Sequence, residues 1–431
     1  MKFLKYLPLN QVLKKNSYSQ NTALILLSKV LITLLVFITT PIIARFYSPE
    51  EYGTYALINS IVIIFSIVST WSLSSEIVVA QSSDLRRLLS FIIQISVIGS
   101  IFLTIILYAV RGVIYNVLDI HLPDYYLIFV PVFVLIVILS ESYSFLNIRD
   151  KLFKKNIVVN TSEVISNKIT SLVLGFLGLT QFGLIIGDFI GKINNLLVQF
   201  FGIGNLGKQK FPLINLFNTR NLFIQGKKYS AYLKYQMPTI LTRRISKQFI
   251  IWLLAIVFSK EELGHYTMAI SLLTIPLNLF SNSFQPIITR KFSDIKTSPD
   301  RLRIFNHSVA LISIISVTMY LGIFVLSEWV VSIYLGKDWN GAIKFIKLLS
   351  ILFAATLLSN SISGAYIIFK QQKLNFLIKI VFSILLFVAL ILALNLNMSL
   401  VMIISIYVTI SVAEELIRLV ILRRKLQNIN E

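Results

Sequence analysis

Long apolar runs alternate with short polar segments along the whole chain of 431 residues. A helix that crosses a bilayer needs about 20 mostly apolar residues. Twelve segments satisfy that requirement, so the pattern predicts an all-α polytopic membrane protein. The predicted spans cover residues 22–43, 55–79, 88–110, 126–147, 157–178, 181–202, 237–258, 265–288, 304–327, 343–368, 377–395 and 399–421.

The longest polar connection, 203–236, lies between the sixth and seventh predicted spans and divides the chain into two sets of six. We therefore predict an N-terminal tail over 1–21, a six-helix bundle over 22–202 and a linker over 203–236. A second six-helix bundle follows over 237–421, and the chain closes with a tail over 422–431.

Composition agrees with a membrane protein, since 56% of the residues are hydrophobic and 14% are charged. Cysteine is absent, which excludes disulfides and thiolate metal sites. The three histidines lie far apart in the sequence, and we expect no metal and no cofactor. The basic, polar beginning precedes an apolar run without a small-residue cleavage signal, so we interpret that run as a retained span.

The net charge of +21 is concentrated in the segments that alternate spans leave on one side. These are the N-terminal tail, the central linker, the C-terminal tail and every second short loop. Because cytoplasmic loops are enriched in Lys and Arg, both termini and the linker are predicted to lie in the cytoplasm. The charge is explained by topology, and we expect a lipid bilayer and no nucleic acid as partner.

One motif occurs twice, as "ARFYSPEEYGTYA" from Ala44 and as "AIVFSKEELGHYT" from Ala255. In both copies Ser-x-Glu-Glu precedes an apolar run, which is typical of a capped helix start. Gly53 and Gly264 fall in the first turn, where a small residue permits close packing. Six spans separate the copies, so they share one orientation. This predicts two bundles related by a parallel pseudo-two-fold axis along the membrane normal.

The early stretch "TPIIARFYSPEEYGTYALINSI", the twelve spans and the two six-helix halves resemble the multidrug/oligosaccharidyl-lipid/polysaccharide (MOP) superfamily. Within it, the chain resembles the Wzx-type O-antigen and capsule repeat-unit flippases. The resemblance implies a MATE-like fold and transport of undecaprenyl-pyrophosphate-linked oligosaccharide to the outer face of the bacterial inner membrane. It also implies a place beside the polymerase and chain-length regulator of lipopolysaccharide or capsule synthesis, and no catalytic residues.

The fifth predicted span is half polar. At about 100° per residue, one stripe holds Asn160, Glu163, Asn167 and Ser171, with Lys168 on its edge. A helix of this kind should avoid lipid, so we expect these residues to line a cavity. Lys168 lies roughly 16 Å along the predicted span, too deep to reach the interface. A structural salt bridge is the alternative for Lys168.

Other charged residues inside predicted spans are candidates for binding pyrophosphate. Lys29, Lys192, Arg243, Arg244 and Lys247 join Lys168 as cationic cavity candidates. Lys29 can instead snorkel, and Lys192 can instead form an i,i+4 pair with Asp188.

Two further roles follow from the spans. Glu163 and Asp188 are candidates for ion coupling, since each is an acid within a predicted span. Pro276, in the eighth span, is a candidate hinge or a static packing kink.

Three rival functions stay open. A MATE-like drug or cation antiporter should have an acidic cavity, whereas the deep charges here are mostly cationic. A lipid II-type flippase is closer, although such flippases typically have fourteen spans. A membrane-embedded polysaccharide polymerase or ligase would need a large outer loop with acid–base groups, and the predicted outer loops are short. We therefore expect a transporter and not an enzyme.

Overall fold

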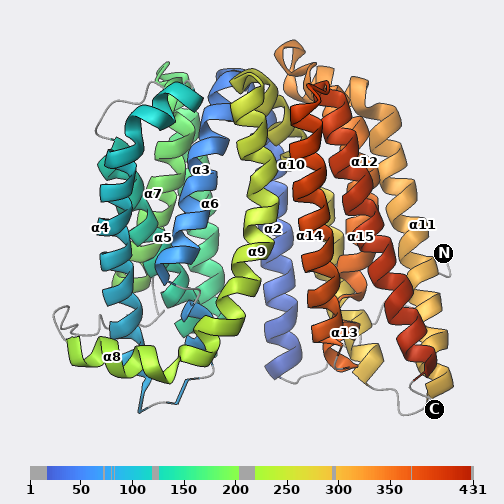
Figure 1. Ribbon diagram of the computed structural model, residues 1–431, viewed down its shortest axis with the longest axis horizontal. Coiled ribbons are helices and arrows are strands. Elements are labelled where there is room, and N and C mark those ends of the chain that lie inside the picture. Colours follow the sequence, from blue (N-terminus) through green and yellow to red (C-terminus); the bar gives the residue numbers. More distant parts are fainter. Residues whose placement is uncertain are drawn as a thin grey trace. The chain divides into compact units, whose positions relative to one another are not determined.

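The computed structural model describes residues 17–70, 73–78, 80–81, 83–118, 126–202, 219–293, 298–369 and 371–428. Within them the secondary structure is entirely helical (Figure 1). Twelve helices of 21 to 34 residues correspond one to one with the predicted spans. They are α2 (Ser17–Phe46), α3 (Pro49–Thr70), α4 (Leu85–Leu118), α5 (Tyr126–Arg149), α6 (Phe153–Phe176), α7 (Thr180–Phe201), α9 (Ser230–Val257), α10 (Lys260–Ser293), α11 (Ser298–Val330), α12 (Ala342–Ile362), α14 (Gln372–Asn395) and α15 (Leu400–Asn428).

Ten of these helices are long and apolar enough to cross a membrane. The described part of α9 offers only a shorter apolar segment, Gln248–Val257, and the two long helices not among the ten are α6 and α9. These are the half-polar fifth predicted span and the seventh, which carries the basic cluster. The predicted all-α polytopic fold is confirmed.

Short helices connect the long ones. They are η2 (Leu73–Val78), α8 (Thr219–Lys228), η3 (Val331–Leu335), η4 (Lys337–Trp339) and α13 (Gly364–Ile368). Helix α8 was not predicted, because we interpreted all of 203–236 as a linker. In the structure, helix occupies 219–228, and α9 begins already at Ser230.

The chain forms two compact units. Unit 1 takes residues up to Thr39 together with Ile58–Leu241, and unit 2 takes Thr40–Leu57 together with residues from Thr242 onward. The division therefore runs through α9 and through α2 and α3, whose adjoining ends belong to unit 2. The sequence placed the division inside 203–236 and kept residues 22–202 together.

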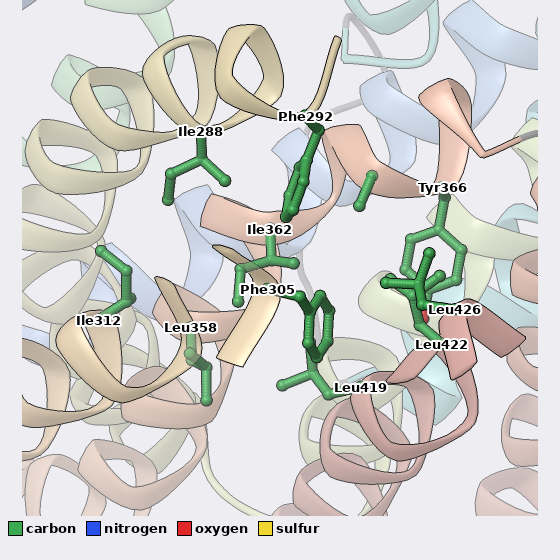
Figure 2. Packing of buried hydrophobic residues seen from close by; sticks show 11 residues of the cluster. Ile288, Phe292, Phe305, Ile312, Leu358, Ile362, Tyr366, Leu419, Leu422 and Leu426 are labelled. Carbon is green, nitrogen blue, oxygen red and sulfur yellow. The ribbon is translucent and has the colours of Figure 1, made fainter. Parts of the chain in front are cut away.

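Unit 2 is built around a cluster of buried apolar side chains from α10, α11, α12, α13 and α15 (Figure 2). Phe292 and Phe305 lie at its centre, each no more than 2% exposed. Burying a side chain of this size contributes roughly 1.5–3 kcal/mol. This packing gives the helices of unit 2 a fixed frame on which polar side chains are held.

Candidate functional site

Helices α6 and α7 of unit 1 approach each other along a glycine face of α7. Gly187 and Gly191 leave no room for a Cβ atom, which would contact the Ser171 hydroxyl and the Glu163 backbone oxygen respectively. Asn167 packs against both glycines. Small residues four apart let two membrane helices approach closely. The polar stripe of α6 is therefore in contact with α7.

Hydrogen bonds and an ion pair join the two helices at this contact. The Lys192 ammonium lies 2.6 Å from a Glu163 carboxylate oxygen. The Asn195 amide donates to the other Glu163 oxygen at 2.6 Å, and the Asn167 amide donates to Asp188 at 3.0 Å. Both predicted ion-coupling acids thus have partners from the opposite helix. The ion pair of Lys192 is with Glu163 across the helices, while Asp188, its expected i,i+4 partner, acts on it electrostatically.

The network continues toward the end of α7 through Gln199, whose side chain is fully buried. Gln199 donates to Asn195 at 2.6 Å and accepts from Asn147 of α5 at 3.2 Å. Its backbone oxygen accepts from the Lys155 ammonium at 3.2 Å. The sequence analysis missed these residues. The spacing of Gly183, Gly187 and Gly191, followed by amides four apart, was the available signal.

The expectation that Ser171 lines a cavity is wrong. Its side chain is 1% exposed and lies against Gly187, so it contacts a neighbouring helix and does not line open space. Glu163 and Asn167 also face α7. The stripe is polar because it meets a polar helix. A cavity role remains a prediction for Asn160 and Lys168, which are partly exposed.

Lys168 differs from Lys192 in its partners. Asp188 is the acid that acts on it electrostatically. In the part of the chain that the structure describes, Lys168 has no ion pair within 4 Å and no side-chain hydrogen bond. Helix α6 begins at Phe153, so Lys168 lies about 22 Å along a helix of roughly 36 Å. A lysine ammonium carries three donors, so a cation at this depth can hydrogen-bond an anionic group.

The remaining predicted residues are dispersed. Lys29 on α2 and Arg244 on α9 are exposed, while the side chains of Arg243 and Lys247 lie outside the described residues. Pro276 lies within α10, and its hinge role stays a prediction.

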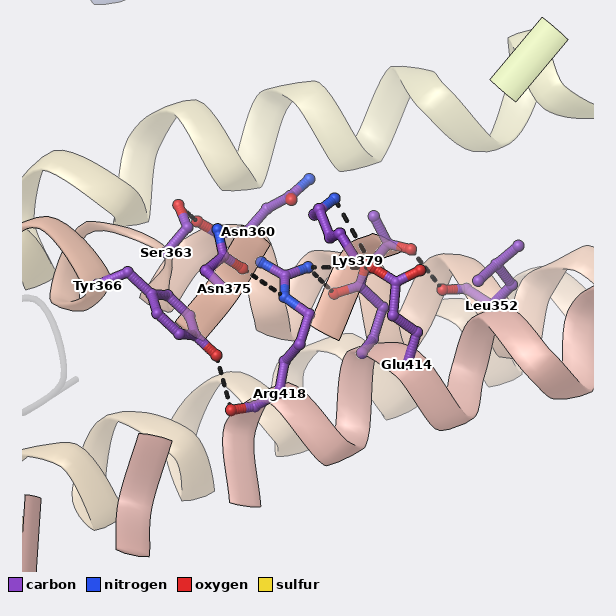
Figure 3. Close-up of polar contacts among 10 residues, drawn as sticks. Leu352, Asn360, Ser363, Tyr366, Asn375, Lys379, Glu414 and Arg418 are labelled. Atoms are coloured by element: carbon purple, nitrogen blue, oxygen red, sulfur yellow. Dashed lines mark hydrogen bonds and ion pairs between the residues drawn. The ribbon is translucent and has the colours of Figure 1, made fainter. Parts of the chain in front are cut away.

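Unit 2 holds a second charge cluster, between α14 and α15 (Figure 3). The Arg418 guanidinium, 4% exposed, donates to Glu415 at 2.7 Å and to the Asn375 side-chain oxygen at 2.9 Å. Glu414 lies 3.8 Å from Lys379 and 4.0 Å from Arg418. Both acids and both cations therefore have an opposite charge within 4.0 Å. These four side chains form a local ion-paired group.

The duplicated motif forms a reciprocal contact within unit 2. A Cβ atom on Gly53 would meet the backbone oxygen of Lys260, and one on Gly264 would meet that of Pro49. Pro49 and Lys260 hold the same place in the two copies, so each half of the contact repeats the other. The predicted close packing at both glycines is confirmed.

The helix starts beside these glycines are capped as predicted. The Ser48 amide donates to the Glu51 carboxylate at 2.7 Å, and the Glu51 amide donates to the Ser48 hydroxyl at 3.3 Å. This is a complete capping box. In the second copy the Glu262 amide donates to the Ser259 hydroxyl at 3.2 Å, while the Glu262 carboxylate binds Lys344 at 2.6 Å.

Trp339 lies against both copies of the motif. Its indole N–H donates to the Ala44 backbone oxygen at 2.8 Å. Its ring meets Tyr52 and His265 edge to face, with centroid separations of 5.0 and 5.9 Å. The side chain is fully buried. The η4 turn thus fixes the two capped helix starts relative to each other.

The sequence matches one protein family, and the fold matches known structures. A family model described as "Polysaccharide biosynthesis protein" matches residues 42–344. A structure of the lipid II flippase MurJ, in an inward closed conformation, superposes with a TM-score of 0.65 at 16% identity. The match covers 92% of this chain and 87% of that one. An inward-facing multidrug resistance MATE family transporter of the MOP superfamily gives 0.63 at 9% identity, over 94% and 99%. No curated protein matches the sequence.

The matched structures are a flippase and a transporter, and both likenesses concern the fold. The family match agrees with the polysaccharide-flippase resemblance drawn from the motif, and the two structures show the fold that the resemblance implies.

Proposed function

Because the chain belongs to the polysaccharide biosynthesis protein family, we propose that it flips undecaprenyl-pyrophosphate-linked oligosaccharide repeat units across the bacterial inner membrane. Transport runs from the cytoplasmic to the outer face by alternating access and supplies O-antigen or capsule synthesis. There a polymerase and a chain-length regulator use the product. The observation that carries this proposal is the family match over 42–344 in a chain with the fold of a flippase.

The pyrophosphate is the costly part of the substrate. The lipid tail can stay in hydrocarbon, whereas an unpaired charge within the bilayer costs several kcal/mol. Cationic side chains offset that cost through charge-assisted hydrogen bonds. In our proposal Lys168 makes this contact in unit 1, because its donors are not occupied by an ion pair. Lys192 is a weaker candidate, since Glu163 already holds it at 2.6 Å.

A lipid II-type flippase is the second candidate, and one observation favours it. The structure of the lipid II flippase MurJ superposes over 92% of this chain. Both substrates would present a pyrophosphate, so the contact of Lys168 does not separate them. A MATE-like drug antiporter has less support, since the matched family concerns polysaccharide synthesis.

Complementation separates these functions. The gene is expressed in a strain that lacks its repeat-unit flippase, and surface glycan and the internal lipid-linked intermediate are measured. We expect glycan to return to the surface and the internal intermediate to fall. A second strain, depleted of its lipid II flippase, should not be rescued. Rescue of the second strain alone would assign the chain to lipid II. A drug-sensitive strain that gains resistance, with no rescue of either flippase strain, would favour an antiporter.

A further inference from the structure

Arg301 lies near the beginning of α11 and is directed into unit 2. On that helix it shares a stripe with Phe305, Ser308 and Ile312, each of which is at most 6% exposed. Its guanidinium carbon lies 5.7 Å from the centroid of the Phe369 ring, just beyond α13. A guanidinium at this distance over an aromatic face is held by a cation–π interaction. The charge of Arg301 is therefore fixed on the inner side of its helix.

The ring under this guanidinium belongs to a packed aromatic group. Phe369 meets Phe292 of α10 edge to face, with the ring centroids 5.5 Å apart, and the Phe292 ring lies 6.4 Å from that of Phe305. Phe292 and Phe305 are members of the buried cluster of unit 2 (Figure 2). Arg301 thus rests on the core of the unit, which holds its guanidinium in place.

The guanidinium has no anionic partner in the part of unit 2 that the structure describes. No carboxylate there lies within 4 Å of it, and its buried Nε atom has no hydrogen-bond partner. Buried polar atoms are nearly always paired in native proteins, so an unpaired one indicates a place where a ligand or solvent binds. The planar fork of arginine matches the oxygens of a phosphate. Arg301 is partly exposed, so a phosphate can reach the fork.

Arg301 lies at the level of the lipid headgroups. The apolar stretch of α10 ends at Ser293, and that of α11 begins at Arg301 itself. At the same end of unit 2, the apolar stretch of α12 and α13 ends at Ile368 and that of α14 begins at Gln372. A residue at the end of an apolar stretch meets the region where hydrocarbon gives way to headgroups. The phosphates that Arg301 meets in a bilayer are therefore those of lipids.

The end of unit 2 that carries Arg301 is basic. Two acids of α15, Glu414 and Glu415, are already paired with Lys379 and Arg418. The other described acids of unit 2 lie at the opposite end of its helices. Basic side chains between membrane helices at the headgroup level bind anionic headgroups. The exposed cations at this end are Lys291, Arg303, Lys373, Arg423, Arg424 and Lys425.

We propose that Arg301 binds the phosphate of an anionic lipid headgroup, with the exposed Lys373, four residues beyond Phe369, adding a second positive charge. The guanidinium supplies two parallel N–H donors to the phosphate oxygens, and the Phe369 ring holds the fork in position. Two lipids carry this chemistry, an acidic phospholipid of the bilayer and the lipid-linked pyrophosphate that awaits transport. The inference rests on unit 2 alone and does not depend on the proposed function.

Native mass spectrometry of the detergent-purified protein measures the binding of individual lipids. The protein is titrated with phosphatidylglycerol, with undecaprenyl pyrophosphate and, as a lipid without net charge, with phosphatidylcholine. We expect Arg301→Gln to weaken binding of an anionic lipid about 10- to 100-fold, the equivalent of one lost charged hydrogen bond. Arg303→Gln is the matched control, because it removes the same charge about 200° around the same helix. It should have little effect on the affinity.

The three lipids identify the ligand. A loss of affinity in Arg301→Gln for phosphatidylglycerol would identify a bilayer phospholipid, and a loss for undecaprenyl pyrophosphate alone would identify the transported lipid. Equal losses in Arg301→Gln and Arg303→Gln would overturn the site, because they would show attraction by the whole basic surface. Equal affinity of the native protein for phosphatidylcholine and for both anionic lipids would overturn it as well.

The unfolding temperature of each variant shows whether it is folded. If Arg301→Gln does not fold, two milder variants carry the test. Arg301→Lys keeps the charge and loses the fork, whereas Phe369→Leu keeps the arginine and loses the ring beneath it. Each should lower the affinity for the anionic lipid in part, and full affinity in both would overturn the proposal.

Discussion

The helix pairs α6–α7 and α14–α15 hold the fifth and sixth places in their respective sets of six predicted spans, and both bury charge. Away from the helix ends, each pair carries two acids and two cations. In α14–α15 both cations lie within 4.0 Å of an acid, and Arg418 is also held by Asn375. In α6–α7, among the residues that the structure describes, Lys192 alone has such a pair. The two helix pairs carry the same number of charges but use them differently. In α14–α15 both cations are held in ion pairs, whereas in α6–α7 the Lys168 ammonium can still bind an anion.

The helices themselves explain this difference. The contact of α6 with α7 is made by glycines and neutral amides, so the helices approach closely without using every charge. In α14–α15 the contact between the helices runs through Arg418. The Tyr366 hydroxyl also donates a hydrogen bond to the Arg418 backbone oxygen, at 2.6 Å. We therefore expect the second cluster to contribute stability, and we propose the first for transport.

The largest expected effect is on stability, from Arg418→Gln. Removing the guanidinium leaves Glu415 without its close cation and leaves Glu414 with Lys379 alone. Breaking a buried pair in this way costs about 3–5 kcal/mol. Thermal unfolding of the detergent-purified protein measures the loss. Lys347→Gln is the matched control, because its 2.6 Å pair with Glu328 is solvent-accessible and should contribute at most about 1 kcal/mol. Equal losses in the two variants would contradict a structural role for the α14–α15 cluster.

A smaller effect on stability is expected from the reciprocal glycine contact. Gly264→Ala places a Cβ atom against the Pro49 backbone, which cannot rotate away, and overpacking of this kind costs roughly 1–3 kcal/mol. Gly53→Ala should cost a similar amount. Because either substitution separates the same two helix starts, the double variant should cost less than the two single costs together.

Gly322→Ala in α11 is the control for this contact, since nothing lies within 4 Å of the added carbon. It should be neutral or stabilising, by up to about 1 kcal/mol. Full additivity of Gly53→Ala and Gly264→Ala would mean that the two glycines do not share one contact. These losses are measured in the same unfolding assay, so they compare directly with that of Arg418→Gln.

The smallest effect concerns pH and the attachment of α8, which lies outside both clusters. The hydrogen bond from Lys228 holds the pKa of the Asp84 carboxyl below its ordinary value. A depressed carboxyl pKa stabilises the folded state above the ordinary pKa, and that stabilisation is lost as the pH falls through the depressed value. We expect α8 to loosen only below about pH 4. Lys228→Ala should abolish this pH dependence.

Maleimide labelling of a Gln225→Cys variant across acidic pH measures the loosening, because position 225 is buried against unit 1. The rate should rise at low pH and stay constant above the ordinary carboxyl range. If the labelling rate rises equally in the Lys228→Ala variant, the loosening at low pH is not caused by protonation of Asp84.

The fold followed from the sequence because hydropathy reports spans directly, and all twelve long helices fall on predicted ones. Helix α8 was not predicted because its ten residues contain no long apolar run. The capping box at Ser48 was predictable, since its signal is local. The partner of Lys192 was not, because periodicity places Glu163 on a face of α6 without showing which helix meets that face. The spacing of the glycines on α7 was the signal that could have identified the helix facing Glu163.

Surface glycan display by Lys168→Gln, in the strain that lacks its own flippase, tests the central claim most directly. At equal protein level and equal unfolding temperature, display should fall about 10- to 100-fold, the equivalent of one lost charged hydrogen bond. The lipid-linked intermediate should accumulate inside. Lys168→Arg should retain part of the activity, and Lys154→Gln should retain all of it. Normal display by Lys168→Gln would contradict the assignment of Lys168 as the cation that carries the pyrophosphate across.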